Sequence, residues 1–344
     1  MINDSWEKFL TEYHARLIND NISDFGNVAE ETEITTHGDI ITWLSHLALL
    51  ILSGKDVVDF LHNLFTTDIK QLEENILQLS AWCNAKGQVV CDFYLYKQGE
   101  SVNILIDKTV QDLFIRKIKL YILRAEVNIV VEDNKILTGI KMESEIPPVK
   151  ALSYLPAKSG NVYNNNNSTY IRLYGAKHRY IIIDDIKNTA TFWQAVKSAL
   201  VMVGNRQWKI LDILDGIAWI TEKSSEQFIP QFINLDYLDA IDFQKGCFPG
   251  QEIIARLHYR SRPGKRTYLL KTSHITDADI GDRIHSKLSD NPVGRIINIE
   301  KLDGDSEIIL AVIENEAVQK NKIFIGNDPD NPVLIESMPY TVNA

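Results

Sequence analysis

The chain has 344 residues, and its 36 Lys and Arg against 46 Asp and Glu give a formal net charge of −10. Hydrophobic residues make up 45% of it and charged residues 24%, which is ordinary for a globular protein. Enough apolar surface is present to offset the entropy of ordering the chain, so an intrinsically disordered protein is excluded. At roughly 100–200 residues per domain, the length predicts two or three domains.

Cysteine content and apolar segments bear on the cellular compartment. The three cysteines, an odd number, do not make a disulfide framework. The longest apolar run, Ile40 to Leu52, is shorter than the ~20 residues that a membrane span needs. The first residues have neither the basic nor the apolar region of a secretory signal. We therefore expect a reduced, cytoplasmic protein without a membrane partner.

The first half of the chain alternates helical and strand patterns. Residues 1–36 hold amphipathic, helix-like pieces and no chemical motif. Apolar residues at i, i+3, i+4 and i+7 predict a helix over 57–64. Alternating residues over 77–106, separated by two polar turns, predict a β-meander. A second helix is expected over 110–123.

The second half becomes richer in strands. Short strands are expected at 127–131, 136–140, 170–173 and 180–183, followed by a helix around 191–203. Beyond Lys265 the pattern is nearly all strand, with segments at 267–271, 294–299, 308–313 and 322–325. Regular short strands separated by Gly, Asp and Asn turns predict a small barrel or sandwich. The predicted class is α+β with an all-β C-terminal module.

One basic segment interrupts the acidic chain. Between Lys245 and Lys271 there are seven basic residues and one acid, Glu252: Lys245, Arg256, Arg260, Arg262, Lys265, Arg266 and Lys271. Such a segment attracts an anionic ligand locally on a protein that otherwise repels nucleic acid. The alternative is a solvated face held by salt bridges.

The densest chemical cluster is Lys245-Gly246-Cys247-Phe248-Pro249-Gly250-Gln251-Glu252. Its two glycines permit close approach of a ligand, and Pro249 suits the entry to a helix. Cys247 would then lie near a helix N-terminus and two residues from an ammonium group, which favours the thiolate form. The alternative is a small buried hydrophobic side chain in a glycine-rich turn.

Other candidate residues carry weaker signals. The spacing of Cys83 and Cys91 matches no zinc or iron–sulfur motif, and the eight histidines are scattered, so no metal is expected on this chain alone. Trp208 and Trp219 bracket an apolar segment, where they could stack on a heteroaromatic ring or pack in the core. No dinucleotide, phosphate-loop, serine-hydrolase or zinc-protease motif is present.

The cluster at 245–252 resembles the Lys-Gly-Cys-[Phe/Tyr]-x-Gly-Gln-Glu signature of the YgfZ family of folate-binding proteins. That family is a sister group of the T-protein, the aminomethyltransferase of the glycine cleavage system. Further segments fit it in order, so that the resemblance covers roughly residues 40–344: 53–68, 83–87, 121–127 and 227–243.

The resemblance implies a multi-domain fold of the T-protein/YgfZ type with a C-terminal β-barrel. It divides the chain into an N-terminal extension (1–36), a folate-binding region of two α+β subdomains (37–258) and the C-terminal barrel (259–344). It also implies tetrahydrofolate or a derivative, held non-covalently, as the cofactor. The family supports the synthesis or repair of iron–sulfur enzymes, and thereby tRNA modification, so the expected partners are transient iron–sulfur client proteins. A monomer that does not bind nucleic acid directly is expected.

The resemblance also carries roles to particular residues. Cys247 becomes the candidate functional thiol, and Asp92 a second candidate for chemistry. A family tryptophan on the pterin side corresponds to Trp208, whereas the position of a second family tryptophan holds Leu47. The implied folate-binding residues are Trp208, Lys245, Gly250, Gln251, Glu252 and Arg256.

Two alternative functions stay open. One is folate-dependent aminomethyl transfer. Against it, the Asp-Asp pair of T-proteins is replaced here by Cys91-Asp92, and their Gly-Tyr-Thr-Gly-Glu stretch is absent. The other is an RNA-binding regulator that uses the basic segment. Because folate itself carries carboxylates that multiply with polyglutamylation, we expect the folate tail to lie against residues 245–271.

Overall fold

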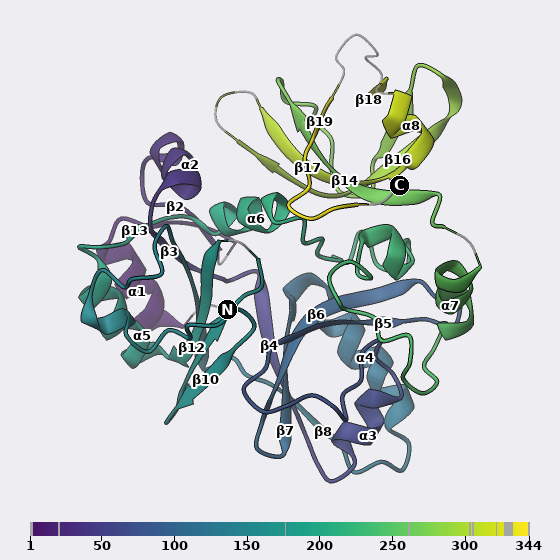
Figure 1. Ribbon diagram of the computed structural model, residues 1–344. Coiled ribbons are helices and arrows are strands. Elements are labelled where there is room, and N and C mark those ends of the chain that lie inside the picture. The colour runs from purple at the N-terminus through teal and green to yellow at the C-terminus, as the bar shows by residue number, and fades with distance from the viewer. Residues whose placement is uncertain are drawn as a thin grey trace.

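The computed structural model describes residues 3–19, 21–175, 177–260, 262–302, 304, 306–320, 322–326 and 333–342. Three large sheets dominate it (Figure 1). The meander forms the first sheet, with strand order β5 (Gln78–Cys83), β6 (Val89–Gln98), β7 (Ser101–Asp107), β4 (Leu47–Ser53) and β8 (Asn128–Val131). The three meander strands predicted from alternation are confirmed.

The second sheet brings together strands that are far apart in sequence. Its order is β10 (Val162–Asn165), β11 (Ser168–Arg172), β12 (His178–Asp185), β9 (Lys135–Met142), β3 (Ile40–Trp43) and β13 (Val201–Met202). The long apolar run at 40–52 is therefore two strands in two sheets, because residues 44–46 turn the chain between β3 and β4.

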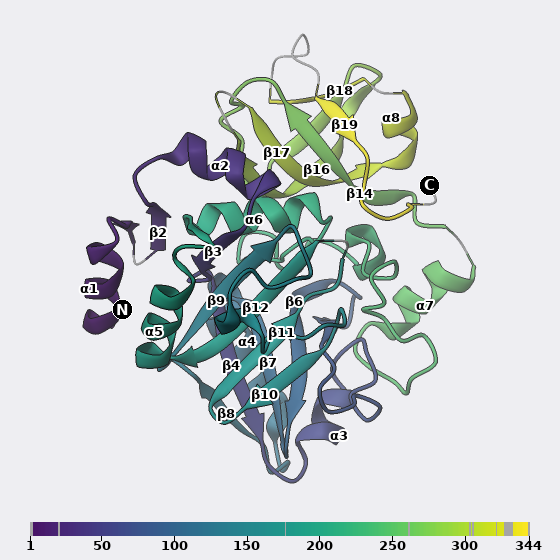
Figure 2. The ribbon, with the colours of Figure 1, turned by 60° about the vertical axis from the view of Figure 1, so that its left-hand side comes forward.

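Helices lie at the outer faces and ends of these two sheets, except for the last one, which lies with the C-terminal strands (Figures 1 and 2). Their bounds are α1 (Asp4–Glu12), α2 (Val28–His37), α3 (Val57–His62), α4 (Gln111–Ile122), α5 (Ile186–Val196), α6 (Asn205–Leu214), α7 (Gln251–Tyr259) and α8 (Asn315–Lys320). Three short 3-10 helices are η1 (Lys108–Val110), η2 (Lys150–Leu152) and η3 (Pro230–Ile233). A small hairpin, β1 (Arg16–Ile18) and β2 (Asn21–Asp24), precedes α2.

The helix predicted around 191–203 lies earlier in the chain than expected. The Asp185 side chain accepts a hydrogen bond from the Asn188 N–H and so caps α5 at its start. The helix ends at Val196, and Val201–Met202 instead pairs in parallel with β3. Tertiary pairing with a buried strand outweighs the helical pattern there.

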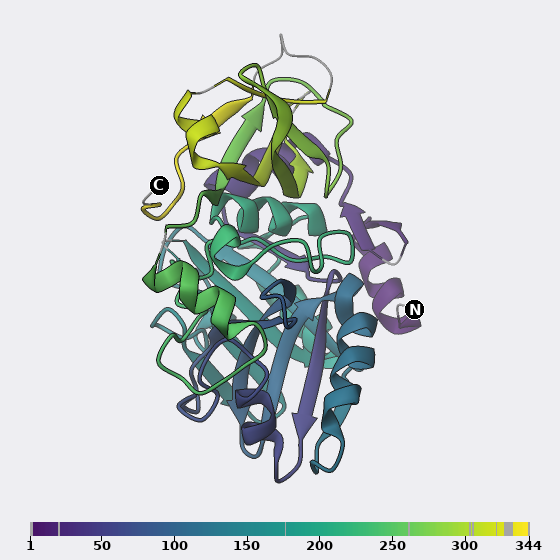
Figure 3. The same ribbon diagram turned by 90° about the vertical axis from the view of Figure 1, so that its right-hand side faces the viewer.

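The C-terminal strands form one curved sheet rather than the closed barrel that was expected. Its order is β18 (Ile323–Ile325), β15 (Arg283–Ser286), β16 (Ser289–Lys301), β17 (Glu307–Glu314), β14 (Lys265–Thr272) and β19 (Leu334–Glu336). Among the described residues the two end strands form no ladder with each other, which closure would require. One hydrogen bond, from the Val333 N–H just before β19 to the Ile323 carbonyl of β18 at 3.2 Å, joins the two edges. Helix α6 contacts β16 and β17, and apolar residues of all three share a core cluster, so this helix covers part of a face of the open sheet (Figure 3).

Helix α6 lies between the second sheet, the N-terminal hairpin and the C-terminal sheet. It contacts β3 of the second sheet, β2 of the N-terminal hairpin and β16 of the C-terminal sheet. One apolar cluster runs between the first and second sheets and through α6 into the C-terminal sheet. The close approach of α6 depends on Gly139 in β9, where a Cβ would come within 2.6 Å of the Trp208 ring.

Candidate functional site

The signature segment is packed against the first sheet. The Lys245 side chain is buried, and its ammonium group donates to the backbone carbonyls of Phe65 and Thr67 at 2.6 and 3.0 Å and to that of His62. Desolvation lowers the pKa of Lys245 to about 8, although Asp68 and Asp242 oppose this shift. In this structure Lys245 ties the loop after α3 to the signature.

Gly250 and Gln251 complete this contact. Gly250 has a left-handed backbone (φ 78°), and its neighbour across the interface is the turn at Asn84–Gly87. The Gln251 amide donates to the carbonyl of Lys245 at 3.3 Å. The signature glycine therefore brings two turns together.

The other predicted site residues of this segment are exposed, whereas Phe248 of the signature is buried in the core. Glu252 and Arg256 are exposed on α7, and Cys247 is a free, exposed cysteine in the loop before that helix. Cys83 and Cys91 are buried, and burial raises the pKa of both thiols. The one cysteine open to solvent is thus the one in the signature.

Trp208 lies under an arginine. Its side chain is 1% exposed, and the Arg179 guanidinium stacks on the ring at 4.1 Å. Arg179 in turn binds Asp212 at 2.5 Å and Asp215 at 2.8 Å. Leu47, at the position of the second family tryptophan, is likewise buried.

Asp92 is also enclosed. Its carboxylate accepts the Ile220 N–H at 2.8 Å, and the residue is 1% exposed. Desolvation raises the pKa of Asp92 to about 7, the hydrogen bond from Ile220 opposes the shift, and the charges of Asp107 and Asp212 add to it. Asp92 thus links the first sheet to the segment that follows α6.

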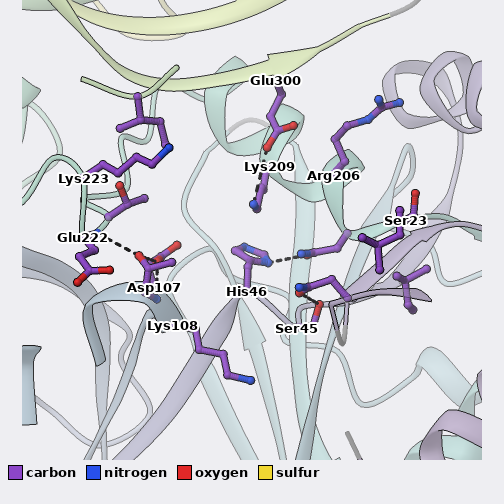
Figure 4. Close-up of a pocket in the computed structure, with 17 residues that line it drawn as sticks. Ser23, Ser45, His46, Asp107, Lys108, Arg206, Lys209, Glu222, Lys223 and Glu300 are labelled. Atoms are coloured by element: carbon purple, nitrogen blue, oxygen red, sulfur yellow. Dashed lines mark hydrogen bonds and ion pairs between the residues drawn. The ribbon is translucent and has the colours of Figure 1, made fainter. Parts of the chain in front are cut away.

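A cavity of about 630 Å³ lies beside α6, between the first sheet, the N-terminal hairpin and the C-terminal sheet (Figure 4). Its wall includes Ser45 and His46 before β4, Asp107 and Lys108 at the end of β7, and Glu300 of β16. Helix α6 contributes Asn205, Arg206 and Lys209, and the N-terminal hairpin contributes Ile18, Asn21, Ile22 and Ser23. The wall is completed by Thr109, Thr221, Glu222, Lys223 and Ile280. None of the site residues predicted from the sequence lines this cavity, although Trp208 belongs to the same helix as three that do.

His46 lines this cavity and carries a buried ring nitrogen without a partner. Its Nδ1 lies 2.5 Å from the Asn205 Oδ1, while its Nε2 is buried without a hydrogen-bond partner. Desolvation lowers the pKa of His46 to about 3, helped by the charges of Lys209 and Arg179, so the ring is neutral near pH 7. Because Nδ1 must donate to the Asn205 oxygen, Nε2 is an acceptor that awaits a donor.

Charged groups surround the imidazole. Lys209 lies 3.7 Å from Glu300, and Lys223 pairs with Asp279. Desolvation raises the pKa of Asp107 and of Glu300, so both carboxyls hold a proton more readily than exposed ones. Lys108 and Arg206 add two cations, and neither forms an ion pair within the described part of the chain.

The N-terminal segment, which carried no motif in the sequence, helps to build this site. The Ser45 hydroxyl donates to Asn21 at 2.7 Å, and the Glu31 carboxylate accepts the Gly204 N–H at 2.8 Å just before α6 begins. Sequence reasoning missed His46 because a single histidine inside an apolar run gives no signal. It missed Asn21 because no local pattern links that residue to β4.

Membrane spans and metal clusters are both absent from the described residues. No helix there is both long and apolar enough to cross a membrane. No group of three or more His, Cys, Asp or Glu side chains in that part of the chain is arranged to hold a metal ion.

Comparisons with known proteins agree with this architecture. No family model matches the chain. Proteins named tRNA-modifying protein YgfZ from Escherichia fergusonii and Escherichia coli (strain SE11) are 27% identical over 302 residues, which cover 87% of this chain and 92% of each relative. The predicted resemblance to the YgfZ proteins is confirmed.

The fold is also that of a solved relative of the YgfZ group. The crystal structure of glycine cleavage system aminomethyltransferase T from Bartonella henselae superimposes with a TM-score of 0.78, covering 97% of this chain and 96% of that chain. The two sequences are 13% identical, so this likeness shows a shared T-protein-like fold and leaves the activity to the residues of the site.

Proposed function

We propose that this YgfZ-like chain binds a reduced folate, tetrahydrofolate or a derivative, non-covalently in the central cavity. The observation that carries the proposal is the neutral His46, which lines the cavity and whose buried Nε2 is an acceptor without a partner. A buried acceptor without a partner costs roughly 1–3 kcal/mol, which a ligand donor recovers. Reduced pterins carry several ring N–H groups and an amino group that can donate.

The size and charge of the cavity support the same ligand class. Its volume of about 630 Å³ falls within the roughly 300–1,000 Å³ typical of small-molecule sites. Lys108 and Arg206 add positive charge to the cavity wall, which favours an anionic ligand such as folate. Trp208 of α6 packs against Gly139 of β9, and neither it nor Arg179 lines the cavity, so in this proposal they hold the helix in place and do not stack on the pterin.

The role of the bound folate follows the family. We propose that the chain is an accessory protein that supports iron–sulfur enzymes, and through them tRNA modification, with Cys247 as the thiol that faces client proteins. Its exposure on the loop before α7, away from the residues that line the cavity, supports a contact with a partner. The division into an extension, a folate-binding region and a C-terminal region belongs to this proposal.

Aminomethyl transfer is the second candidate. Asp92, at the position of the T-protein carboxylate pair, is enclosed and bonded to Ile220, so it does not serve a ligand in the cavity. Asp107 and Glu300 favour the candidate, because both line the cavity and both have raised pKa values suited to proton transfer. Folate-dependent release of ammonia from an aminomethyl donor would reveal such turnover.

Calorimetric titration with tetrahydrofolate tests the binding proposal. His46→Leu removes the acceptor and should weaken binding by roughly 1–3 kcal/mol, whereas His285→Leu, outside the cavity, should bind like the parent. If loss of the Asn205 partner disturbs folding, His46→Leu with Asn205→Leu replaces both polar groups and keeps the test valid. Absence of heat with any folate at millimolar concentration would overturn the proposal.

A cellular assay tests the accessory role separately. In cells that lack the protein, the parent chain should restore the activity of iron–sulfur enzymes, and His46→Leu should restore it less well. If a variant that no longer binds folate restores enzyme activity fully, folate binding is not needed for the accessory role, and the proposed link between the two is refuted.

A further inference from the structure

A second groove, of about 550 Å³, lies beside the C-terminal sheet. Its cationic residues are Lys265, Arg283 and Arg295, and Phe228 and Val312 are among its apolar residues. No carboxylate is among the described residues that line it. On a chain with a net charge of −10, this is an unusual concentration of positive charge.

The two arginines are held next to each other by the sheet. Arg283 of β15 and Arg295 of β16 are direct partners in the antiparallel register, so their side chains project from the same face. Like charges in such a position repel each other unless an anion lies between them. Arg295 donates to the Gln227 side chain at 2.5 Å, and neither arginine forms an ion pair within the described part of the chain.

Lys265 is the third cation of this face. It lies 3.0 Å from Glu314, and both side chains remain about 40% exposed. An exposed pair of this kind contributes little to stability and is easily rearranged by a competing anion. The groove therefore offers two uncompensated charges and a third that an anionic ligand can recruit.

Two chain segments link the groove with the central cavity, although the two hollows share no lining residue. Lys223 lines the cavity, and its backbone carbonyl accepts a 2.5 Å hydrogen bond from Gln227, which lines the groove. A second segment also extends from the cavity to the groove. Ile280 lines the cavity, and Arg283, three residues later, lines the groove. A ligand that leaves the cavity past Lys223 thus meets Arg295 and Arg283.

We propose that this groove binds the glutamate tail of the folate held in the central cavity, as a run of carboxylates along Arg295, Arg283 and Lys265. The inference rests on the proposed function, because it needs the folate ring in the cavity. Each further glutamyl residue adds one carboxylate, so a longer tail would neutralise more of this face.

This proposal places the folate tail differently from the sequence analysis, which expected it to lie against residues 245–271. Within 245–271, Lys245 is consumed by backbone carbonyls, and Arg266 forms a buried bidentate pair with Asp236 at 2.6 and 2.9 Å. Lys265 is the basic residue of that segment that lines the groove. The arginines that join it come from strands beyond the segment.

Calorimetry with monoglutamyl and triglutamyl tetrahydrofolate tests the proposal. The parent should bind the triglutamate at least about tenfold more tightly at low salt, and added salt should reduce this gain. Arg283→Ala with Arg295→Ala should remove the gain and keep the monoglutamate affinity, and Arg283→Lys with Arg295→Lys should restore most of it. Lys271→Ala, an exposed cation of the same basic segment outside the groove, should keep the gain.

The possible failures are distinguishable. Equal affinities for the two folates, or a gain that survives in the double alanine variant, would overturn the tail site while leaving folate binding intact. No binding of the monoglutamate would instead refute the proposed function. If a short single-stranded RNA binds in an arginine-dependent manner while the triglutamate gains nothing, the groove would be a nucleic-acid site and the inference would be wrong.

Discussion

Gly250 and Gly87 lie in such close contact that a Cβ on Gly250 would come within 2.4 Å of the Gly87 Cα. One glycine belongs to the signature and the other to the turn between β5 and β6, more than 160 residues earlier. The two glycines of this contact explain why both turns are rich in small residues: the backbones themselves form the interface.

Gly250→Ala should therefore destabilise the protein strongly. The substitution adds a left-handed strain of roughly 1–2 kcal/mol to a clash with backbone atoms that cannot move aside, so we expect a loss of at least about 3 kcal/mol. Gly99→Ala is the matched control, because Gly99 has φ 59° and open space around the added Cβ. Urea unfolding of the two variants should differ clearly, and equal losses would contradict the close contact.

Lys245→Met should lower stability without any ligand present. The variant keeps the apolar stem but leaves the carbonyls of His62, Phe65 and Thr67 without their ammonium donor, at a cost of roughly 2–4 kcal/mol. Lys271→Met, at an exposed position, should change stability by less than about 0.5 kcal/mol. A stable Lys245→Met that loses folate affinity would instead assign this lysine to the ligand.

Asp92→Asn should change how the free energy of unfolding depends on pH, because the Asp92 carboxyl is buried. The folded pKa of Asp92 is about 7, above its ordinary value of 3.8, so between these values the folded state binds more protons than the unfolded state. The contribution of Asp92 to stability is thus present below pH 3.8 and is lost as the pH rises to 7. The asparagine variant should gain relative to the parent from about pH 4 to about pH 8, by up to about 4 kcal/mol. Parallel stability profiles would contradict an enclosed carboxyl.

His46 should affect the pH dependence of stability in the direction opposite to Asp92, with stability lost as the pH falls. Its folded pKa of about 3 lies below the ordinary 6.5, so the unfolded state binds the extra proton between these values. Stability from this group is complete above pH 6.5 and is lost as the pH falls toward 3. His46→Leu should therefore flatten the acid side of the stability profile. Folate affinity should show no titration of this ring between about pH 5 and about pH 8.

Cys247 should be the first cysteine to react with iodoacetamide in the native protein. It is exposed, whereas Cys83 and Cys91 are at most 1% exposed and should react after unfolding. Cys247→Ala should keep the native unfolding midpoint, since an exposed side chain in a loop makes few contacts. Yet it should fail to restore iron–sulfur enzyme activity in cells. Rescue equal to the parent would remove Cys247 from the proposed function.

Local patterns in the sequence determined much of the fold. Alternation predicted the meander of β5, β6 and β7, and helical spacing predicted α3 and α4, because these elements pair or pack with neighbours close in the chain. The eight residues of the signature at 245–252 were sufficient to indicate the family, and the curated relatives confirm that resemblance. The sequence also placed four of the six C-terminal strands, but it missed β15 and β19 and could not show that their sheet stays open.

Long-range packing decided the rest. Whether a basic side chain can bind an anion depends on partners far away in sequence. The Lys245 ammonium donates to backbone carbonyls near residue 65, and Arg266 pairs with Asp236. Arg283 and Arg295, which are neighbours in the sheet, remain available to a ligand. The cavity itself is built from segments near residues 20, 46, 107, 206, 222 and 300, none of which carries a motif. The acceptor on His46 exists because Asn205 and desolvation fix the protonation of its ring, and both conditions arise when α6 packs between the sheets.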